Sequence, residues 1–432
     1  MLVYIHVPFC RTRCNYCAFY SNPLGRGVSA SESPAVRDYV DSLFMEMALW
    51  GDRLAGKQVR SVFFGGGTPS LLPPRIIESI LNRLHKAFVW ADKAEVTLEA
   101  NPESLRGGHI IRQYLDAGIN RLSIGLQTLD DTLLRMLGRP HKAHDSLHAV
   151  FMAREAGCAN ISVDLMWGLP GQGVRQWLQT LKDVCRMGPD HISSYGLTLE
   201  AGSPLEQDCA SGRLSLPPER DQNIMFSEGA ALLESKGYLQ YEISNFARMG
   251  FQCRHNLGYW EGADYLGLGP SATSTIEGRR WTNPAGQRLW DEGIRAGSLD
   301  DKAEVLTPKI RILELLMLRL RTARGLRLRD YRELTGRDFM RDHQRLVQAL
   351  HENKLVRLRD GYLRLTRSGM LVSNSILRNL FERTDKLLDQ LPEAAAAALQ
   401  ARQARLEAAR NELPEDDEPK PIHWERVVSR EG

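Results

Sequence analysis

Three cysteines near the start of the chain have the type and spacing of a metal-binding site. Cys10, Cys14 and Cys17 lie within eight residues, in the stretch YIHVPFCRTRCNYCAFYS. Three thiols are an odd number for a disulfide framework, and a chain with seven cysteines, three of them clustered, fits a reducing compartment where thiolates bind metal. A structural zinc site usually takes two pairs of ligands, and no second pair follows. An iron–sulfur cubane with one open iron suits three close thiolates better, while zinc and unligated thiols stay open from the spacing alone.

Polar residues follow strand-like runs in the first part of the chain. They are Thr68, Glu99, Gln127 and Asp164. Thr68 comes directly after a run that ends in three glycines. In parallel α/β folds the carboxyl edge of the sheet is where sites are built, so we expect these side chains at one edge. A nucleotide P-loop is not predicted, because no Gly-Lys-Ser/Thr follows the glycines.

The elements that must position these residues alternate along residues 2 to 240. The strand-like runs are 2–7, 61–67, 95–101, 121–127, 161–169 and 191–199, and the stretches with helical spacing between them are 34–55, 73–90, 104–118, 142–157 and 174–187. This alternation predicts a parallel sheet wound with helices. Six units fall short of eight, so the α/β fold is expected to be an open or partial barrel over residues 1–240.

The rest of the chain divides into three expected parts. Residues 241–306 are richer in glycine and aromatics, show no clear period and are interpreted as a connecting region. Residues 307–381 combine helices with a hairpin turn at Asp360-Gly361, which predicts a small winged-helix-like α+β unit. Residues 382–432 read as an exposed helix followed by a disordered charged tail.

Composition narrows the function classes. Hydrophobic residues make up 43% and charged residues 25% of the 432 residues, as in a globular protein with a large core. The 56 basic and 53 acidic residues give a net charge of +3, which does not predict a polyanionic partner such as nucleic acid. Neither a signal peptide nor an apolar run long enough for a membrane span is found, so we expect a cytoplasmic protein.

The cysteine spacing, with Tyr16 just before the last cysteine, resembles that of radical-SAM enzymes. YIHVPFC and the downstream FFGGGTPSLL narrow the resemblance to the branch that contains oxygen-independent coproporphyrinogen III dehydrogenase and haem chaperones. It extends over nearly all of residues 1–380 and implies a partial (β/α)6 radical-SAM barrel with a [4Fe–4S] cluster and S-adenosylmethionine. In that family three thiolates bind three irons, and the open iron chelates the amino and carboxylate groups of S-adenosylmethionine, which yields a 5′-deoxyadenosyl radical.

The resemblance also implies which residues contact S-adenosylmethionine. They are Tyr4, Gly66, Gly67, Thr68, Glu99, Gln127, Arg139 and Asp164. Carboxylates such as Glu99 and Asp164 can accept hydrogen bonds from ribose hydroxyls or the ammonium group, and Arg139 can pair with the methionine carboxylate. The glycines would let backbone N–H groups approach the methionine end.

Two departures from the dehydrogenase pattern favour the chaperone branch. Phe19 stands where the dehydrogenase carries a further cysteine, and nine residues precede Cys10 where the dehydrogenase has a long extension. CRHNLGYW (253–260) matches the His-Asn-x-x-Tyr-Trp signature of the haem chaperones, which implies His255 as an axial haem ligand with Tyr259 and Trp260 against the porphyrin. Cys253 is interpreted as a small buried thiol.

We therefore expect a haem chaperone that binds haem and delivers it to acceptor haem proteins, with enzymatic activity left open. One alternative is coproporphyrinogen III dehydrogenase. The other is nucleic-acid binding through the arginine-rich RLRDYRELTGRDFMRDHQR of the C-terminal unit, whose acids are almost as numerous.

Overall fold

The computed structural model describes residues 1–25, 29–391 and 393–412. Its centre is a curved sheet whose strand order is β14-β13-β12-β11-β1-β4-β5-β6-β7-β8-β10-β9. Six parallel strands follow one another in chain order: β1 (Leu2–Val7), β4 (Gln58–Gly66), β5 (Val89–Ala100), β6 (Arg121–Gln127), β7 (Ile161–Trp167) and β8 (His191–Gly196). The predicted partial barrel is confirmed.

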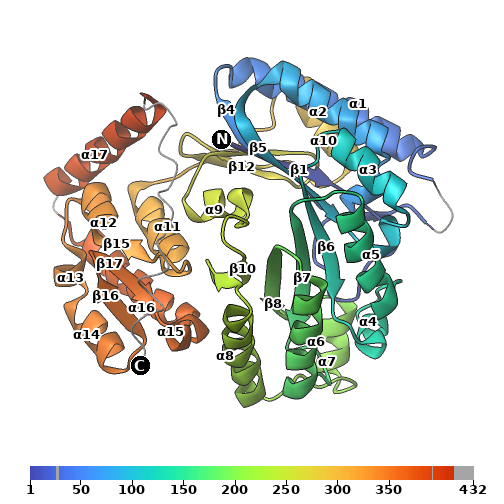
Figure 1. Ribbon diagram of the computed structural model, residues 1–432. Coiled ribbons are helices and arrows are strands. Elements are labelled where there is room, and N and C mark those ends of the chain that lie inside the picture. Colours follow the sequence, from blue (N-terminus) through green and yellow to red (C-terminus); the bar gives the residue numbers. More distant parts are fainter. Residues whose placement is uncertain (26–28, 392, 413–432) are drawn as a thin grey trace.

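Helices cover the outer face of this sheet (Figure 1). They are α1 (Pro34–Arg53), α2 (Pro74–Ala87), α3 (Gly108–Asp116), α5 (Ala143–Glu155) and α6 (Val174–Met187). The shorter α4 (Asp131–Met136) and α7 (Pro204–Ala210) and the longer α8 (Glu219–Ser235) follow strands β6 and β8. Two 3-10 turns, η1 (Pro69–Leu71) and η2 (Pro102–Ser104), and the small pair β2 (Phe9–Cys10) and β3 (Asn22–Pro23) lie beside the sheet's carboxyl edge.

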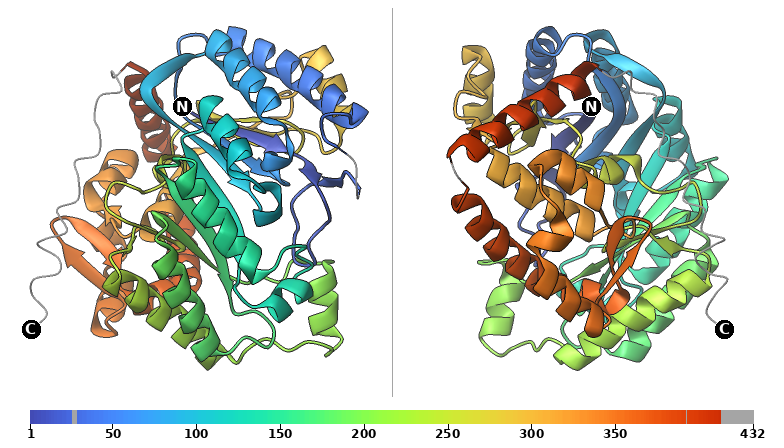
Figure 2. Two further views of the ribbon diagram at one scale, coloured as in Figure 1. Left: turned by 45° about the vertical axis from the view of Figure 1, so that its right-hand side comes forward. Right: turned by 90° about the vertical axis from the view of Figure 1, so that its left-hand side faces the viewer.

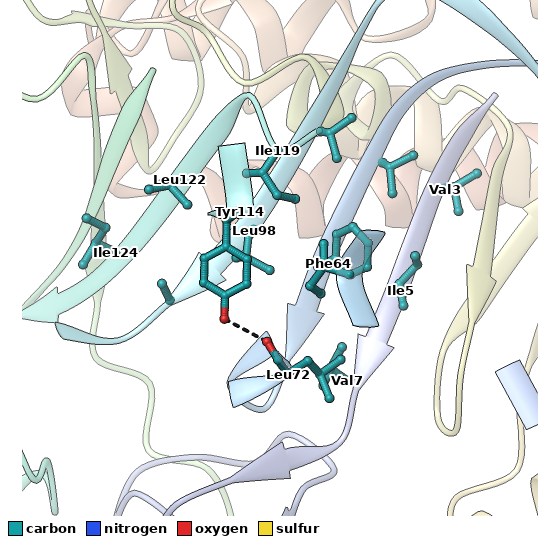
Figure 3. Close-up of a cluster of buried hydrophobic side chains, with 14 of the residues drawn as sticks. Val3, Ile5, Val7, Phe64, Leu72, Leu98, Tyr114, Ile119, Leu122 and Ile124 are labelled. Atoms are coloured by element: carbon teal, nitrogen blue, oxygen red, sulfur yellow. Dashed lines mark hydrogen bonds between the residues drawn. The ribbon is translucent and has the colours of Figure 1, made fainter. Parts of the chain in front are cut away.

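The strands alternate between an apolar outer face and a polar inner face. Figure 3 shows outward residues such as Ile5, Phe64 and Leu98 in the buried layer beneath the helices, where Tyr114 Oη donates a hydrogen bond of 2.8 Å to the Leu72 carbonyl. Each aliphatic or aromatic side chain of this size stabilises the fold by about 1.5–3 kcal/mol when buried. Because successive strand residues point to opposite faces, the intervening polar residues must face the inside of the barrel.

Residues 241–306 extend the sheet at its β1 edge and supply short strands at its β8 edge. The strands of this region are β10 (Asn245–Ala247), β11 (Tyr265–Leu268), β12 (Thr273–Ile276), β13 (Arg279–Thr282) and β14 (Glu304–Val305), and β9 (Leu239–Gln240) lies just before it. Strand β11 pairs in parallel with β1, and β10 pairs antiparallel with β8. Helices α9 (Arg254–Trp260) and α10 (Gln287–Ala296) lie between them. The region expected to be a connection is therefore part of the sheet. Its strands are too short to show a period in the sequence.

The C-terminal unit packs on one side of the barrel, orange and red in Figure 2. Its helices are α11 (Pro308–Leu320), α12 (Leu328–Thr335), α13 (Phe339–Asp342), α14 (Gln344–Glu352) and α15 (Arg367–Leu371), and its sheet has the order β15 (Leu326–Arg327), β17 (Tyr362–Leu365), β16 (Val356–Arg359). The predicted hairpin turn is confirmed: Asp360 and Gly361 both have positive φ, 53° and 76°, as a tight two-residue turn requires. The unit contacts the barrel through α8 and α9.

The last described segment is less exposed than expected. Helix α16 (Ser373–Asp389) runs through residue 381, the position expected as a boundary, and α17 (Glu393–Glu412) follows. Leu399 and Gln403 of α17 are buried, so this helix packs on α11 and α12 and does not stand free in solvent. The tail expected to be disordered, 413–432, falls outside the described residues. None of the described helices combines the length and apolarity of a membrane span.

Candidate functional site

A cavity of about 1040 Å³ fills the inside of the barrel. The residues predicted to bind the cluster or S-adenosylmethionine, and the predicted haem ligand, all line it: Tyr4, Cys10, Cys14, Cys17, Gly66, Gly67, Thr68, Glu99, Gln127, Arg139, Asp164 and His255. The loop with the three cysteines closes the carboxyl end of the strands. Helix α9 brings His255 to another part of the wall.

The three cysteines lie on β2 and the turn that follows it. Cys10 ends β2, and Cys14 accepts a backbone hydrogen bond of 3.3 Å from Cys17. Burial raises the pKa of the Cys10 and Cys17 thiols, so metal binding here must displace protons. Within the described ranges, no three His, Cys, Asp or Glu side chains are grouped for a single metal ion.

The glycines at the end of β4 allow two chain segments to approach closely. Gly66 has φ +109°, and a Cβ there would lie 2.7 Å from the His6 ring; a Cβ on Gly67 would lie 2.5 Å from the Phe9 carbonyl oxygen. The expected role of the glycine N–H groups is wrong for Gly67, because its N–H donates to Val7 O at 2.8 Å. The Gly66 N–H instead donates a hydrogen bond to the Glu99 carboxyl on the cavity wall.

Two carboxyl groups that line the cavity lie within their strands, close enough for their charges to interact. Glu99 is the penultimate residue of β5 and Asp164 the middle residue of β7, so the expectation that they follow their strands is wrong. Burial, and then the charge of Asp164, raise the pKa of Glu99 to about 8. Burial also raises the pKa of Asp164, although Ser123 donates a hydrogen bond of 3.1 Å to its carboxylate. A cationic or hydroxyl-bearing ligand would relieve this unfavourable burial of charge.

Arg139 is fixed between the cysteine loop and the end of β6. Its Nη2 donates to Asn101 Oδ1 at 2.6 Å and to the Gly125 carbonyl at 2.7 Å, and its Nη1 lies 3.5 Å from Cys14 Sγ. Asn101 in turn donates to Thr68 Oγ1 at 3.1 Å. The guanidinium therefore places positive charge beside a thiol that would be ionised on binding iron.

His255 lies on the short helix α9, within the region expected to be a connection without a clear period. Its Nδ1 is 2.9 Å from Ser61 Oγ, while its Nε2 is buried without a hydrogen-bond partner. Burial, and then the nearby Arg121, lower the pKa of His255 to about 3, so the imidazole is neutral at pH 7. Phe63 and Tyr259 flank the ring at centroid distances of 5.1 and 4.9 Å. A neutral imidazole with a free nitrogen is the form that binds a metal.

Trp260 does not line the barrel cavity, although the sequence predicts it beside Tyr259 against the porphyrin. A second cavity of about 670 Å³ lies between α9, the β12–β13 hairpin, α11 and α17. Tyr259 lines both cavities, but Trp260 lines the second one alone. A flat ligand inside the barrel can therefore contact His255 and Tyr259 without touching Trp260.

Other residues of the cavity wall are not predicted by any motif in the sequence. Asn101, Arg121, Ser193 and Tyr195 all line the cavity. Arg121, Ser123, Gly125 and Gln127 occupy alternate positions of β6, with the buried apolar residues Leu122, Ile124 and Leu126 between them. This alternation in the sequence indicates that one face of the strand is polar, but it does not show that this face lines the cavity.

Comparisons with known proteins agree with this architecture. The model of the radical SAM superfamily matches residues 4–184, and that of the HemN C-terminal domain matches residues 306–372. The chain is 36% identical over 408 residues to radical S-adenosyl methionine domain-containing protein 1, mitochondrial, of Bos taurus, which covers 90% of this chain and 89% of that protein. It is 32% identical over 376 residues to the heme chaperone HemW of Bacillus subtilis, with 86% and 97% covered.

A solved structure shares the fold. The chain superposes on coproporphyrinogen III oxidase (HemN) of Escherichia coli, a radical SAM enzyme, with a TM-score of 0.73 and 23% identity over 89% of this chain and 90% of that one. At this identity the match concerns the arrangement of the elements alone.

Proposed function

This chain belongs to the radical SAM family that includes the heme chaperone HemW, and we propose that it binds haem and delivers it to acceptor haem proteins. The family implies a [4Fe–4S] cluster and S-adenosylmethionine. The observation that supports the haem proposal is the unpartnered Nε2 of His255, on the wall of the same cavity that the three cysteines line. We keep the cytoplasm as a prediction, since relatives include both bacterial and mitochondrial proteins.

In this proposal Cys10, Cys14 and Cys17 hold the cluster, whose open iron would bind S-adenosylmethionine. The chain's own residues hold the remaining parts of that ligand. Glu99 and Asp164 accept hydrogen bonds from its hydroxyl or ammonium groups, and Arg139 supplies positive charge near its carboxylate. Tyr4, Gln127, Thr68 and the two glycines, Gly66 and Gly67, shape the wall around it.

Haem transfer and porphyrinogen turnover separate the chaperone from the dehydrogenase. The protein should be purified anaerobically, assayed for iron and sulfide, and titrated with haem. We expect haem binding, transfer to an apo haem protein and no change in coproporphyrinogen III. Conversion of coproporphyrinogen III would establish the dehydrogenase, and failure to bind haem would contradict the chaperone.

Ion pairs within the C-terminal unit weigh against the nucleic-acid alternative. Arg337 pairs with Asp342 at 2.7 Å, and Arg329 pairs with Glu333 at 2.5 Å. Arg332 also pairs with Asp338. Much of the positive charge in this arginine-rich stretch is therefore neutralised internally, whereas phosphate binding requires it to face the ligand.

Glu99→Gln should weaken the binding of S-adenosylmethionine about 10- to 150-fold, because a hydrogen bond to a charged group contributes about 1.5–3 kcal/mol. With a pKa of about 8, Glu99 is protonated at pH 7 and must lose its proton to accept a bond from a cation. Wild-type binding at pH 7 should therefore release about one proton more than binding to the variant. Calorimetry in two buffers of different ionisation enthalpy measures both quantities.

Glu242→Gln is the matched control for this experiment. Glu242 is also buried with a raised pKa, of about 7, but it does not line the cavity. Its substitution should leave affinity and proton release at wild-type values. Equal affinity and equal proton release in wild type and Glu99→Gln would remove Glu99 from the ligand site.

A further inference from the structure

Arg121 is a buried cation that forms no hydrogen bond or ion pair with the residues that the structure describes. It is the first residue of β6, its side chain is 1% exposed, and it lines the barrel cavity. Its Nε is buried with no hydrogen-bond partner, and among the residues that the structure describes none forms an ion pair within 4.0 Å of the guanidinium. Arg139, in the same cavity, is by contrast held by Asn101, Gly125 and Cys14.

The acids nearest to Arg121 are engaged by other donors. Both oxygens of Glu95 accept bonds from the start of α9: Oε1 from the His255 N–H at 3.1 Å and Oε2 from the Arg254 N–H at 3.1 Å. Asp164 accepts a bond from Ser123. A guanidinium keeps its charge at all pH values, and a buried charge is unfavourable unless it is paired. The charges of Glu95 and Asp164 favour the guanidinium, but neither carboxylate bonds to it. A directly bonded anion is therefore expected to enter with a ligand.

The methionine carboxylate of S-adenosylmethionine is in the wrong place to be that anion. In the proposed function it binds at the open iron, beside the cysteines at the carboxyl end of β6, where Arg139 bonds to Gly125 and Cys14. Arg121 begins the same strand. Since strand residues rise about 3.3 Å each, the Cα atoms of Arg121 and Gln127 are about 20 Å apart.

His255 lies at the same end of the cavity as Arg121. Its ring is hydrogen-bonded to Ser61, the residue of β4 that pairs with Leu2 at the start of β1. The charge of Arg121 also acts on the imidazole. An unpartnered imidazole nitrogen and an unpartnered guanidinium thus share one wall. A ligand that satisfies both carries a metal and a carboxylate, and haem has two propionates on one edge.

We propose that Arg121 binds a propionate of haem at the amino end of the barrel strands, on the same wall as the open nitrogen of His255. This inference rests on the proposed haem function and adds the group that recognises the acid edge of the porphyrin. The planar guanidinium can hold a carboxylate through two parallel hydrogen bonds.

The test compares haem with haem dimethyl ester, whose propionates carry no charge. Dissociation constants are measured by absorbance for the anaerobically prepared full chain, and the quantity of interest is the ratio of ester to haem. Wild type should bind the ester about 10- to 100-fold more weakly. Arg121→Gln should bring the ratio close to one by weakening haem alone, and Arg121→Lys should keep part of the discrimination.

Arg280→Gln is the matched control, because Arg280 lines the second cavity beside Trp260 and pairs with Glu314 at 2.6 Å. It should keep the wild-type ratio. Three results for the ester-to-haem ratio of dissociation constants would overturn the inference. They are a wild-type ratio near one, a wild-type ratio in Arg121→Gln, or a ratio near one in Arg280→Gln. An Arg121→Gln variant that loses affinity for S-adenosylmethionine while keeping the haem ratio would overturn it as well. If wild type binds neither porphyrin, the proposed function itself fails.

Discussion

A variant in which Cys10, Cys14 and Cys17 are all replaced by alanine should contain no iron–sulfur cluster. Wild type prepared anaerobically should hold about four irons and four sulfides per chain, since three thiolates can bind three irons of a cubane and leave the fourth open. All three thiols line one cavity, and two of them stay protonated in the metal-free protein because burial raises their pKa. Iron, sulfide and the visible spectrum measure the loss.

The chain offers a control with the same number of thiols removed. Cys158, Cys185 and Cys209 are free cysteines that do not line the cavity. Their triple alanine variant should keep the full iron and sulfide content. If the Cys10, Cys14 and Cys17 variant retains the wild-type spectrum, or if the control variant loses it, the cluster assignment is wrong.

The sequence predicts the parallel core well because the strand-like runs and the stretches with helical spacing alternate regularly there. The runs at 2–7 and 121–127 coincide with β1 and β6, and the stretch at 174–187 coincides with α6. Strands packed beneath helices need an apolar outer face, and helices need an apolar stripe. Both patterns can be recognised within a short stretch of sequence.

Features that depend on contacts between distant segments could not be predicted in the same way. The open nitrogen of His255 depends on Ser61, 194 residues away, which occupies the other ring nitrogen. Among the residues that the structure describes, Arg121 lacks an ion pair because the Glu95 carboxylate accepts hydrogen bonds from the first N–H groups of α9. The position of Trp260 on the second cavity alone depends on α9 forming the wall between two cavities. None of these follows from spacing along the chain.

The variant His255→Gly should lose the wild-type Soret and visible bands of bound haem while keeping its cluster. An axial imidazole sets the electronic spectrum of haem iron, and its removal should weaken haem binding about tenfold or more, which is about 1.4 kcal/mol. Transfer to an apo acceptor should fall with it. Residual binding is expected, because Tyr259 and Phe63 still offer apolar surface to the porphyrin.

Added imidazole separates ligation from a structural role. It should enter the space left by the side chain and restore the wild-type bands of His255→Gly, which a merely misfolded variant would not do. His191 supplies a matched control: it is equally buried, and its Nδ1 also lies near a strand serine, Ser162, at 2.8 Å, but its Nε2 is occupied by Tyr241 at 2.8 Å. His191→Gln should therefore leave the haem spectrum unchanged.

Cys253→Ala tests the competing ligand two residues upstream. Cys253 Sγ lies 3.4 Å from Glu95, and burial raises the pKa of this thiol to about 12, so it carries no thiolate at neutral pH. Its substitution should leave the absorbance bands of bound haem close to those of wild type. Altered haem bands in Cys253→Ala with unaltered bands in His255→Gly would move the ligand to the cysteine, and unaltered bands in both would leave HNLGYW as a structural helix that separates the two cavities.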